Sequence, residues 1–260
     1  MLEPSLVYDA FTDIPRVFRR AMLREYLQYK TLQYIYRTKT STGIVLMGGT
    51  ALRIFYSSGR FSEDLDFDSG EVSRDSLKET AISVADEFRM EDLECTLSFG
   101  KGTAFSAKLK FTNILQRWEL TGHDDEILML RFDASPQFYR YRAEMKVLNR
   151  LDVITPVPVA PADLLLAQKL YSLINRGRMM GRDIFDASYL FGFAEPDTDY
   201  LLEKLQVSSR TEVAGLIMDR LDATGMSRMI EDVEPFLPDR DDLMRVRLFP
   251  QILANWADQQ

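Results

Sequence analysis

The chain has 260 residues, of which 46% are hydrophobic and 28% are charged, and its net charge is -8. This is an ordinary globular composition, and the length allows one large or two modest domains. The negative balance excludes a protein that coats nucleic acid over its whole surface, so any contact with nucleic acid must be local. The single cysteine, Cys95, has no partner for an internal disulfide, which suits a reducing cytoplasm.

The ends and the histidine content narrow the function classes further. The amino terminus lacks a positively charged start followed by an apolar core, and no apolar run is long enough to span a bilayer. We therefore expect a cytoplasmic protein without membrane contact. The only histidine, His123, lies in the polar stretch TGHDDE, which leaves a Ser-His-Asp or Cys-His arrangement with a single candidate base in a loop.

The first predicted element is an amphipathic helix over residues 15–38. The apolar residues Phe18, Met22 and Tyr26 recur there at intervals of four, with arginines between them. This pattern is typical of a helix that packs against a core.

A strand, a glycine turn and a helix follow. Residues 44–47 predict a short buried strand, Gly48-Gly49-Thr50 a turn, and residues 51–55 a helical stretch. Such a turn lets the backbone pass close to a ligand and points its N–H groups outward, which suits phosphate. Gly-Gly turns after strands are also common without a ligand, so the turn alone leaves both interpretations open.

A second strand alternates acidic and apolar residues. Asp64, Asp66 and Asp68 alternate there with Leu65 and Phe67, although like charges on one strand face repel. Side chains two apart face the same way, so the first two aspartates present their carboxylates to one point. Magnesium prefers such hard oxygen ligands. The alternative is a polar edge-strand face, which carboxylates also suit.

The rest of the amino-terminal part is predicted to be a helix and two strands. The helix covers residues 73–88, and the strands cover residues 105–111 and 127–132. The amino-terminal part is therefore mixed α and β. Its basic residues Lys101, Lys108 and Lys110 are interpreted as a solvated strand face.

A proline-rich stretch marks the predicted domain boundary. Residues 154–163, ITPVPVAPAD, read as an extended connection that cannot become helical until Pro161 starts the next helix. We expect a first domain of residues 1–155 and a helical domain of residues 156–260. The helices of the second domain are LLLAQKLYSLIN, RDIFDASYLFGF and two weaker amphipathic segments ending near Trp256.

The glycine turn and the paired carboxylates together suit phosphoryl or nucleotidyl transfer, because positioning and charge neutralisation carry most of such catalysis. The strings GGTALRI, GRFSEDLDFD and KLYSLINRGRMMGRDIFDASYL resemble the AbiEii-type nucleotidyltransferase toxins of abortive-infection and type IV toxin-antitoxin systems. These toxins belong to the polymerase-β-like nucleotidyltransferase superfamily. The resemblance covers roughly residues 44–192.

The resemblance implies an α+β fold in which a mixed sheet with flanking helices is followed by a helical carboxy-terminal domain. That domain would contribute a lysine and an aspartate to the active-site cleft. The resemblance also implies that Gly48, Gly49 and Thr50 hold a nucleoside triphosphate, while Asp64 and Asp66 hold Mg²⁺.

Further site residues are implied with alternatives. The superfamily often adds a third carboxylate from a later strand, and Asp133 in LMLRFDAS is the best match. It would hold a metal and activate the attacking hydroxyl, or else cap the loop that follows it. Lys169 and Asp183 correspond to the family's active-site lysine and aspartate. Asp183 and Asp186, one helical turn apart, take part in the chemistry directly or hold Lys169 and Arg182 in place by ion pairing.

A basic patch is predicted on the downstream helices. Lys169, Ser172 and Arg176 are spaced at i, i+3 and i+7, so they line one helix face. Arg178 and Arg182 follow with no acidic residue in between, and the patch suits a triphosphate or an RNA backbone. For Arg178 we favour a solvated side chain, and Arg182 is a candidate nucleotide contact.

Three residues flank the glycine turn and the aspartates. Arg53 and Arg60 are candidate phosphate contacts or simply exposed charges. Ser62 is a candidate regulatory phosphorylation site, because a phosphate there would repel the nucleotide and compete for the metal. An ordinary loop serine is the alternative.

The predicted function is Mg²⁺-dependent transfer of a nucleoside monophosphate from an NTP to an acceptor. The resemblance implies the 3′ end of tRNA as acceptor, a block of translation, and an antitoxin protein as partner. One alternative is a non-catalytic nucleotide-sensing or protein-binding module. Another is a D-x-D phosphatase, which DFDSG at residues 66–70 faintly resembles, although GRFSE does not supply the apolar strand that such a site requires.

Overall fold

The computed structural model describes residues 1–38, 43–123, 125–207 and 209–259, and the chain forms two compact units. Unit 1 comprises Met1–Tyr56 and Phe61–Val159, and unit 2 comprises Ser57–Arg60 and Ala160–Gln260. The division after Val159 lies slightly downstream of the boundary predicted at residue 155. The segment Ser57–Arg60, which lies within the predicted first domain, belongs to unit 2.

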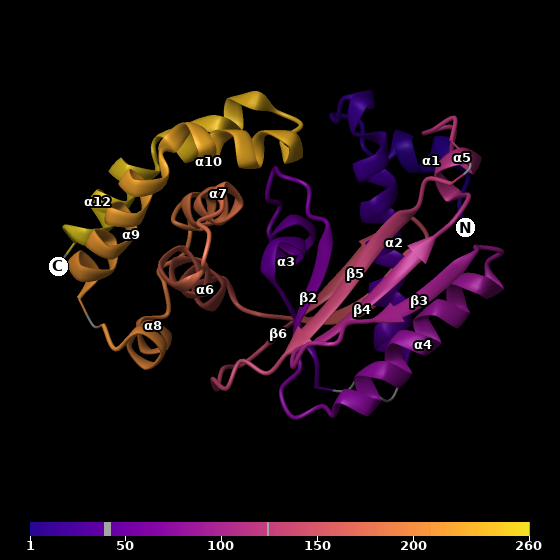
Figure 1. Cartoon of the computed structure of the whole chain (residues 1–260), viewed down its shortest axis with the longest axis horizontal. Helices are drawn as coiled ribbons and strands as arrows, with labels where there is room; N and C mark the ends of the chain where they lie inside the picture. Colours follow the sequence, from indigo (N-terminus) through magenta and orange to yellow (C-terminus); the bar gives the residue numbers. More distant parts are fainter. Residues whose placement is uncertain (39–42, 124, 208, 260) are drawn as a thin grey trace. The chain divides into compact units, whose positions relative to one another are not determined.

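Within the described residues, unit 1 is built on a seven-stranded mixed sheet with the order β3-β4-β5-β2-β1-β7-β6 (Figure 1). The pairs β2–β5 and β1–β7 are parallel, and the other neighbours are antiparallel. This arrangement confirms the predicted α+β class. The strands are β1 (Val45–Met47), β2 (Asp64–Asp68), β3 (Cys95–Phe99), β4 (Phe105–Phe111), β5 (Leu128–Ser135), β6 (Glu144–Arg150) and β7 (Val153–Val159).

Helices cover one face of this sheet. Helix α2 packs against β7 and β5, and α4 packs against β3 and β4 (Figure 1). Helix α4 is capped by Ser73, whose side chain accepts a hydrogen bond from the Ser76 backbone N–H. The helices of unit 1 are α1 (Pro4–Asp9), α2 (Arg19–Arg37), α3 (Gly48–Phe55), α4 (Arg74–Met90) and α5 (Ile114–Arg117), with a 3-10 turn η1 (Arg16–Phe18) before α2.

Strands β4 and β5 each have one buried and one polar face. Phe111 of β4 is buried against Phe88 of α4, with ring centroids 4.9 Å apart. The residues that alternate with the buried ones, such as Lys108 and Arg131, are partly exposed. Because successive strand side chains point to opposite sides, the helix-covered core and the polar face are fixed by the sequence alternation.

Two strands were not predicted, and one connection was wrong. Strands β3 and β6 are absent from the predicted elements, and most of residues 154–163 form β7 instead of a linker. Pro156 and Pro158 lie within β7, where they pair in register with β6. On its other side, β7 pairs with β1 only at Val159. Pro156 and Pro158 therefore have no strand on that side to which a backbone N–H could donate, and the lack of this group costs no hydrogen bond there.

Unit 2 is helical, as predicted. Helix α7 lies at its centre and packs against α6, α10, α11 and α12. No helix in the described part of the chain combines the length and apolarity that crossing a bilayer requires. The helices are α6 (Ala162–Asn175), α7 (Gly181–Leu190), α8 (Thr198–Leu205), α9 (Arg210–Thr224), α10 (Met226–Val233), α11 (Met244–Arg247) and α12 (Phe249–Ala257), with 3-10 turns η3 (Glu234–Phe236) and η4 (Arg240–Leu243).

The close approach of α7 and α10 depends on Gly181. A Cβ added there would lie 1.9 Å from the carbonyl oxygen of Met229, a backbone atom that cannot swing aside. Gly181→Ala is therefore expected to lower the free energy of unfolding by about 1–3 kcal/mol in a denaturant titration. Gly215→Ala is the matched control, because no atom of the described residues lies within 4 Å of its added Cβ in α9. Equal stabilities of the two variants would contradict the tight contact.

Candidate active site

The glycine turn lies directly against the first carboxylates of β2. Strand β1 ends at Met47, and α3 begins at Gly48, whose φ of +70° lies in the left-handed region that favours glycine. Met47 is in register with Asp66, and a Cβ on Gly48 would lie 2.6 Å from Asp66 Oδ2. The turn predicted for phosphate and the carboxylate predicted for metal are therefore adjacent.

Thr50 fixes the start of β2. Its side chain is fully buried, and its hydroxyl donates a hydrogen bond of 2.5 Å to the backbone carbonyl of Asp64. The neighbouring Gly49 is also buried within α3. The contact shows Thr50 holding the strand that carries Asp64, because its hydroxyl is engaged with that strand.

Asp133 joins this site through the pairing of β2 with β5. The structure places it inside β5, in register with Asp66, so the loop-cap alternative does not hold. Its Oδ1 is buried and has no hydrogen-bond partner among the described residues. A buried carboxylate oxygen without a partner is costly, and a bound cation would remove that cost.

Arg131 is a site residue that the sequence reasoning missed. It is in register with Asp64, and its Nη1 lies 3.9 Å from Asp64 Oδ2 and 3.7 Å from Asp133 Oδ2. All three side chains are about a third exposed, so water weakens the attraction. The signal in the sequence was its position two residues before Asp133, which puts both on one strand face. The guanidinium partly neutralises the carboxylates.

The carboxylate oxygens of this site suit Mg²⁺ as ligands. Asp133 Oδ1, which has no hydrogen-bond partner among the described residues, offers one such ligand oxygen. In the residues that the structure describes, no group of three or more His, Cys, Asp or Glu side chains is gathered to hold a metal. The fit is therefore to an ion held by one or two carboxylates, with water and phosphate as its remaining ligands. Magnesium is usually bound in this way beside phosphates.

Asp68, the third aspartate of β2, has a structural role. It is buried, and it accepts hydrogen bonds from the Gly70 N–H at 2.9 Å, the Gln137 N–H at 3.1 Å and the Tyr141 hydroxyl at 2.9 Å. Burial and the neighbouring Asp68 carboxylate raise the pKa of Tyr141, which keeps the hydroxyl a donor. Asp68 thus ties β2 to the segment after β5.

Unit 2 contains a buried cluster of charges around α7. Lys169 Nζ of α6 lies 2.9 Å from Asp183 Oδ1 and 2.8 Å from Asp186 Oδ2. Arg60 binds Asp186 through two hydrogen bonds of 2.6 Å, from Nε and Nη2. Arg176 Nη1 donates to Asp183 Oδ2 at 2.7 Å. The lysine and the two aspartates of the third family string are therefore brought together.

The ion pairs outweigh the burial of these charges. Burial alone would raise the pKa of Asp186, but Arg60 and Lys169 lower it below its usual range. Burial alone would lower the pKa of Lys169, but the two aspartates raise it. Asp186 is fully buried and Arg60 nearly so, which means that Arg60 is not an exposed loop charge. Its bidentate contact supports the ion-pairing alternative for Asp186.

The predicted basic patch of unit 2 is mostly neutralised. Helix α6 ends at Asn175, so Arg176 lies just beyond the helix and not on the predicted face. Lys169 and Arg176 are paired with carboxylates of α7. Arg178 is exposed, as expected for a solvated side chain, and its Nη2 lies 3.4 Å from Asp232 Oδ1. The structure therefore supports the ion-pairing alternative for Lys169 and departs from the predicted basic helix face at Arg176.

Arg53 and Arg182 make specific contacts within their own units. Arg53 Nε lies 2.7 Å from Glu25 Oε2, and its guanidinium lies 4.4 Å from the ring centroid of Phe61. Arg182 lies 4.9 Å from the ring centroid of Phe236. Ser62 is half-buried, and its environment does not distinguish it from an ordinary loop serine. Nucleotide contacts by the arginines and phosphorylation of Ser62 stay predictions.

Two solved structures share this fold. A crystal structure of JHP933 from Helicobacter pylori aligns with a TM-score of 0.56 and 16% identity, covering 92% of both chains. A putative nucleotidyltransferase from H. pylori aligns with a TM-score of 0.56 and 17% identity, covering 92% of this chain and 95% of the other. No curated protein matches the chain.

The sequence also matches one protein family over most of its length. The match covers residues 31–255, which include both the glycine turn with its aspartates and the charge cluster of unit 2. The family is described as nucleotidyl transferase AbiEii toxin, type IV TA system. The chain therefore belongs to the AbiEii family of nucleotidyltransferase toxins.

Proposed function

We propose that the chain transfers a nucleoside monophosphate from an NTP to an acceptor and releases pyrophosphate. The observation that carries the proposal is the contact between Gly48 and the Asp66 carboxylate, with Asp133 in register beside Asp66. This arrangement supports a phosphate-binding turn directly beside metal-binding carboxylates. Strand β2 begins only at Asp64, so the apolar strand that a D-x-D phosphatase requires before its aspartates is missing.

Each residue has a proposed role. Backbone N–H groups of Gly48 and Gly49, at the start of α3, bind phosphate oxygens. One or two of the carboxylates of Asp64, Asp66 and Asp133 hold Mg²⁺, which when bound neutralises triphosphate charge. Asp133 also accepts the proton of the attacking hydroxyl.

The acceptor and partner are proposed from the family. The family is one of toxins in type IV toxin-antitoxin systems, which supports an antitoxin protein as partner. We propose RNA as acceptor, specifically the 3′ end of tRNA, with a block of translation in the cytoplasm as the result. Lys169 and Asp183 are proposed as active-site residues by the same resemblance, and Arg53 and Arg182 as nucleotide contacts by their sequence positions.

The experiment is label transfer. The purified protein is incubated with Mg²⁺, each α-labelled NTP separately and total tRNA, beside an Asp66→Ala variant and a metal-chelated sample. Label on RNA that is lost in both controls supports the proposal. Label on protein would replace RNA as the acceptor and keep the chemistry. No transfer, together with an NTP-dependent rise in melting temperature, would favour the nucleotide-sensing module instead.

Gly48→Ala is expected to reduce transfer at least tenfold, because its Cβ would displace the Asp66 carboxylate, and misplacing a reacting group by about 1 Å can cost on the order of 10²-fold. Gly70→Ala is the matched control. Its φ of +51° imposes similar backbone strain, but the nearest atom to its Cβ is the Gly43 carbonyl oxygen at 3.5 Å. Initial rates and melting temperatures are measured for both. Equal rates in the two variants would refute a special role for Gly48.

A further inference from the structure

The polar sheet face beside the active site carries a line of cations. Lys108 and Lys110 lie on the same side of β4, alternating with the buried Leu109. Lys108 is directly opposite Arg131 of β5, and Arg131 is directly opposite Asp64 of β2. Opposite residues of neighbouring strands point to the same face. The line therefore runs from Lys110 through Lys108 and Arg131 to the carboxylates.

Among the described residues, these cations have no counter-charges beyond the carboxylates at one end of the line. In the described part of the chain, neither lysine forms an ion pair or a side-chain hydrogen bond. Their neighbours on β3, Ser98 and Thr96, are neutral. Lys108 and Arg131 lie directly opposite one another, and like charges in this position destabilise a sheet. An anion from outside the protein would relieve this repulsion.

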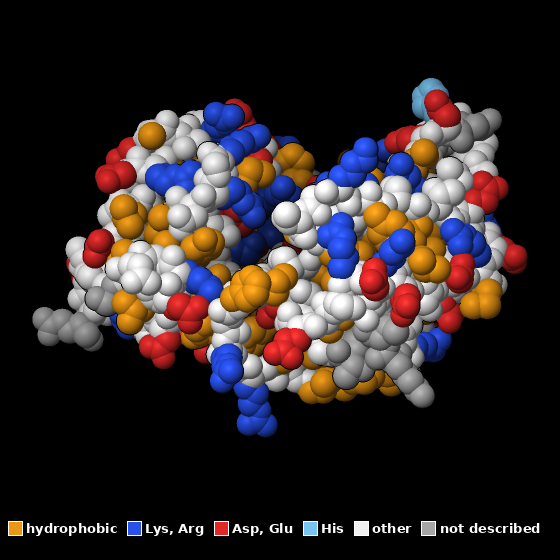
Figure 2. All heavy atoms as spheres, turned by 60° about the horizontal axis from the view of Figure 1, so that its bottom comes forward, with side chains coloured by type: hydrophobic (Ala, Val, Ile, Leu, Met, Phe, Trp, Pro, Cys, Tyr) orange, Lys and Arg blue, Asp and Glu red, His pale blue; other side chains and the backbone are white. Residues whose placement is uncertain are grey.

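The dimensions suit a polynucleotide strand. Residues two apart on a strand are about 6.7 Å apart, and neighbouring strands are about 4.8 Å apart, so the line spans roughly 8 Å. A stacked single strand carries a phosphate about every 3.4 Å, so the line covers two or three phosphates. On the face drawn in Figure 2, basic side chains occur beside acidic ones, and the net charge of the chain is -8, so contact with nucleic acid must be local.

We propose that Lys110, Lys108 and Arg131 form an RNA track that binds the phosphate backbone of the acceptor strand. The inference rests on the proposed function, because the track leads toward Asp64 and Asp133, where the acceptor's terminal hydroxyl would react. The two lysines bind RNA without NTP or metal. They do not contribute to binding of the triphosphate.

The test measures binding of a short fluorescein-labelled single-stranded RNA by anisotropy over a range of salt concentrations, without NTP or Mg²⁺. Each phosphate contact contributes about 0.7 to the slope of log K against log salt for a single strand. The double variant Lys108→Gln/Lys110→Gln is expected to lower the magnitude of this slope by about 1.4 and to weaken binding roughly 25-fold at 0.1 M salt.

The matched control is Arg142→Gln/Arg150→Gln, which changes the net charge equally. Arg150 lies on β6, at the sheet edge opposite to β3, and Arg142 lies in the segment before β6. Its slope is expected to equal that of the unmodified protein. An equal loss of slope in both double variants would reduce the effect to net charge and overturn the track. An unchanged slope in the lysine variant would overturn it as well.

A second measurement, of NTP binding, tests whether the two lysines bind the phosphates of RNA or those of the triphosphate. Affinity for NTP with Mg²⁺, followed by thermal shift, is expected to be the same in the lysine variant and the unmodified protein. Weaker NTP binding with an unchanged RNA slope would assign the lysines to the triphosphate and overturn the inference. The Asp66→Ala variant is expected to lose nucleotidyl transfer but to keep the salt dependence of RNA binding. The two measurements therefore distinguish a failure of the proposed catalytic function from a failure of the proposed RNA track.

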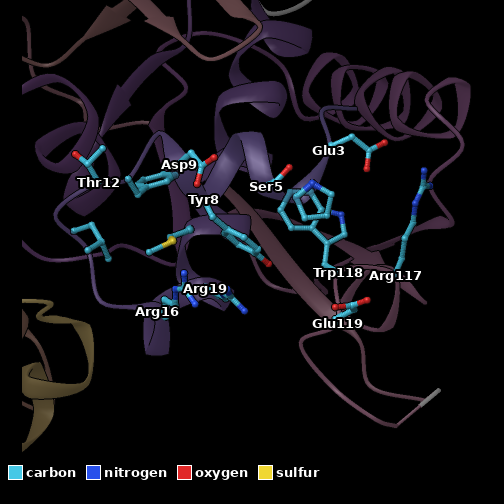
Figure 3. A pocket seen from close by; sticks show the side chains of 14 residues that line it. Glu3, Ser5, Tyr8, Asp9, Thr12, Arg16, Arg19, Arg117, Trp118 and Glu119 are labelled. Carbon is cyan, nitrogen blue, oxygen red and sulfur yellow. The ribbon is translucent and has the colours of Figure 1, made fainter.

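Unit 1 also has a hollow among its helices. It has a volume of about 970 Å³ and lies between α1, α2 and α5, where Tyr8 is placed between Arg19 and Trp118 (Figure 3). Its lining holds equal numbers of basic and acidic side chains, so its charge selects no class of ligand.

Discussion

Asp66→Asn is expected to reduce nucleotidyl transfer by on the order of 10³-fold, because stabilisation of phosphate charge by a bound metal is worth several kcal/mol. The amide keeps the shape of the side chain and removes the charge that would hold the metal. The backbone of Gly48 lies against this side chain, so its position should persist. Transfer rates and Mn²⁺ affinity are measured together, and both should fall.

Asp68→Asn is the control from the same strand. Asp68 is engaged by three donors, so its change should lower the free energy of unfolding by about 1–3 kcal/mol. Transfer by the folded variant should remain. The reverse pattern, with transfer lost at Asp68 and kept at Asp66, would show that the metal-binding carboxylates have been assigned to the wrong end of β2.

Asp186→Ala is expected to lower the free energy of unfolding by about 3–5 kcal/mol, because removing one partner of a buried ion pair leaves the other charge uncompensated. Here two charges, Arg60 and Lys169, would lose a carboxylate that is fully buried. Denaturant titration measures the change. Asp219→Ala, at an exposed position of α9, is the control and should shift stability by less than about 0.5 kcal/mol. Similar losses in the two variants would contradict a buried cluster.

The same cluster sets a pH window. The pKa of Asp186 is lowered on folding, so its contribution to stability is fully present above the unfolded value of about 3.9 and is lost as the pH falls through the folded pKa. The pKa of Lys169 is raised, so its contribution is fully present below about 10.4 and is lost as the pH rises through the folded pKa. Asp186→Asn should therefore flatten the acid limb of the stability profile below about pH 4.

Local patterns predicted the parts of the site that lie close together in sequence. The glycine turn and the alternation of Asp64 and Asp66 were visible because strand periodicity fixes which side chains share a face. Arg131 was missed because only the register of β5 against β2 brings it to Asp64. The pairing of Arg60 with Asp186 joins residues 126 positions apart, a relation that no local spacing encodes.

The missed strands have their own physical explanations. Strand β6 lies at an edge of the sheet and buries only Leu148, so its sequence lacks the alternation of a half-buried strand. Strand β3 lies at the other edge and buries only Cys95. The prolines of β7 were interpreted as a break in the sheet. Their pairing partner, β6, was not predicted, so there was no reason in the sequence to place the prolines in a strand.

The placement of Ser57–Arg60 in unit 2 affects how the chain matures during synthesis. Arg60 leaves the ribosome long before its partner Asp186, because 126 positions separate them. At about 5–20 residues per second, the guanidinium waits for several seconds or more. A fragment ending at Val159 would keep that arginine permanently without its carboxylate. The helical unit therefore completes its charge balance only late in translation, with a segment contributed from the first quarter of the chain.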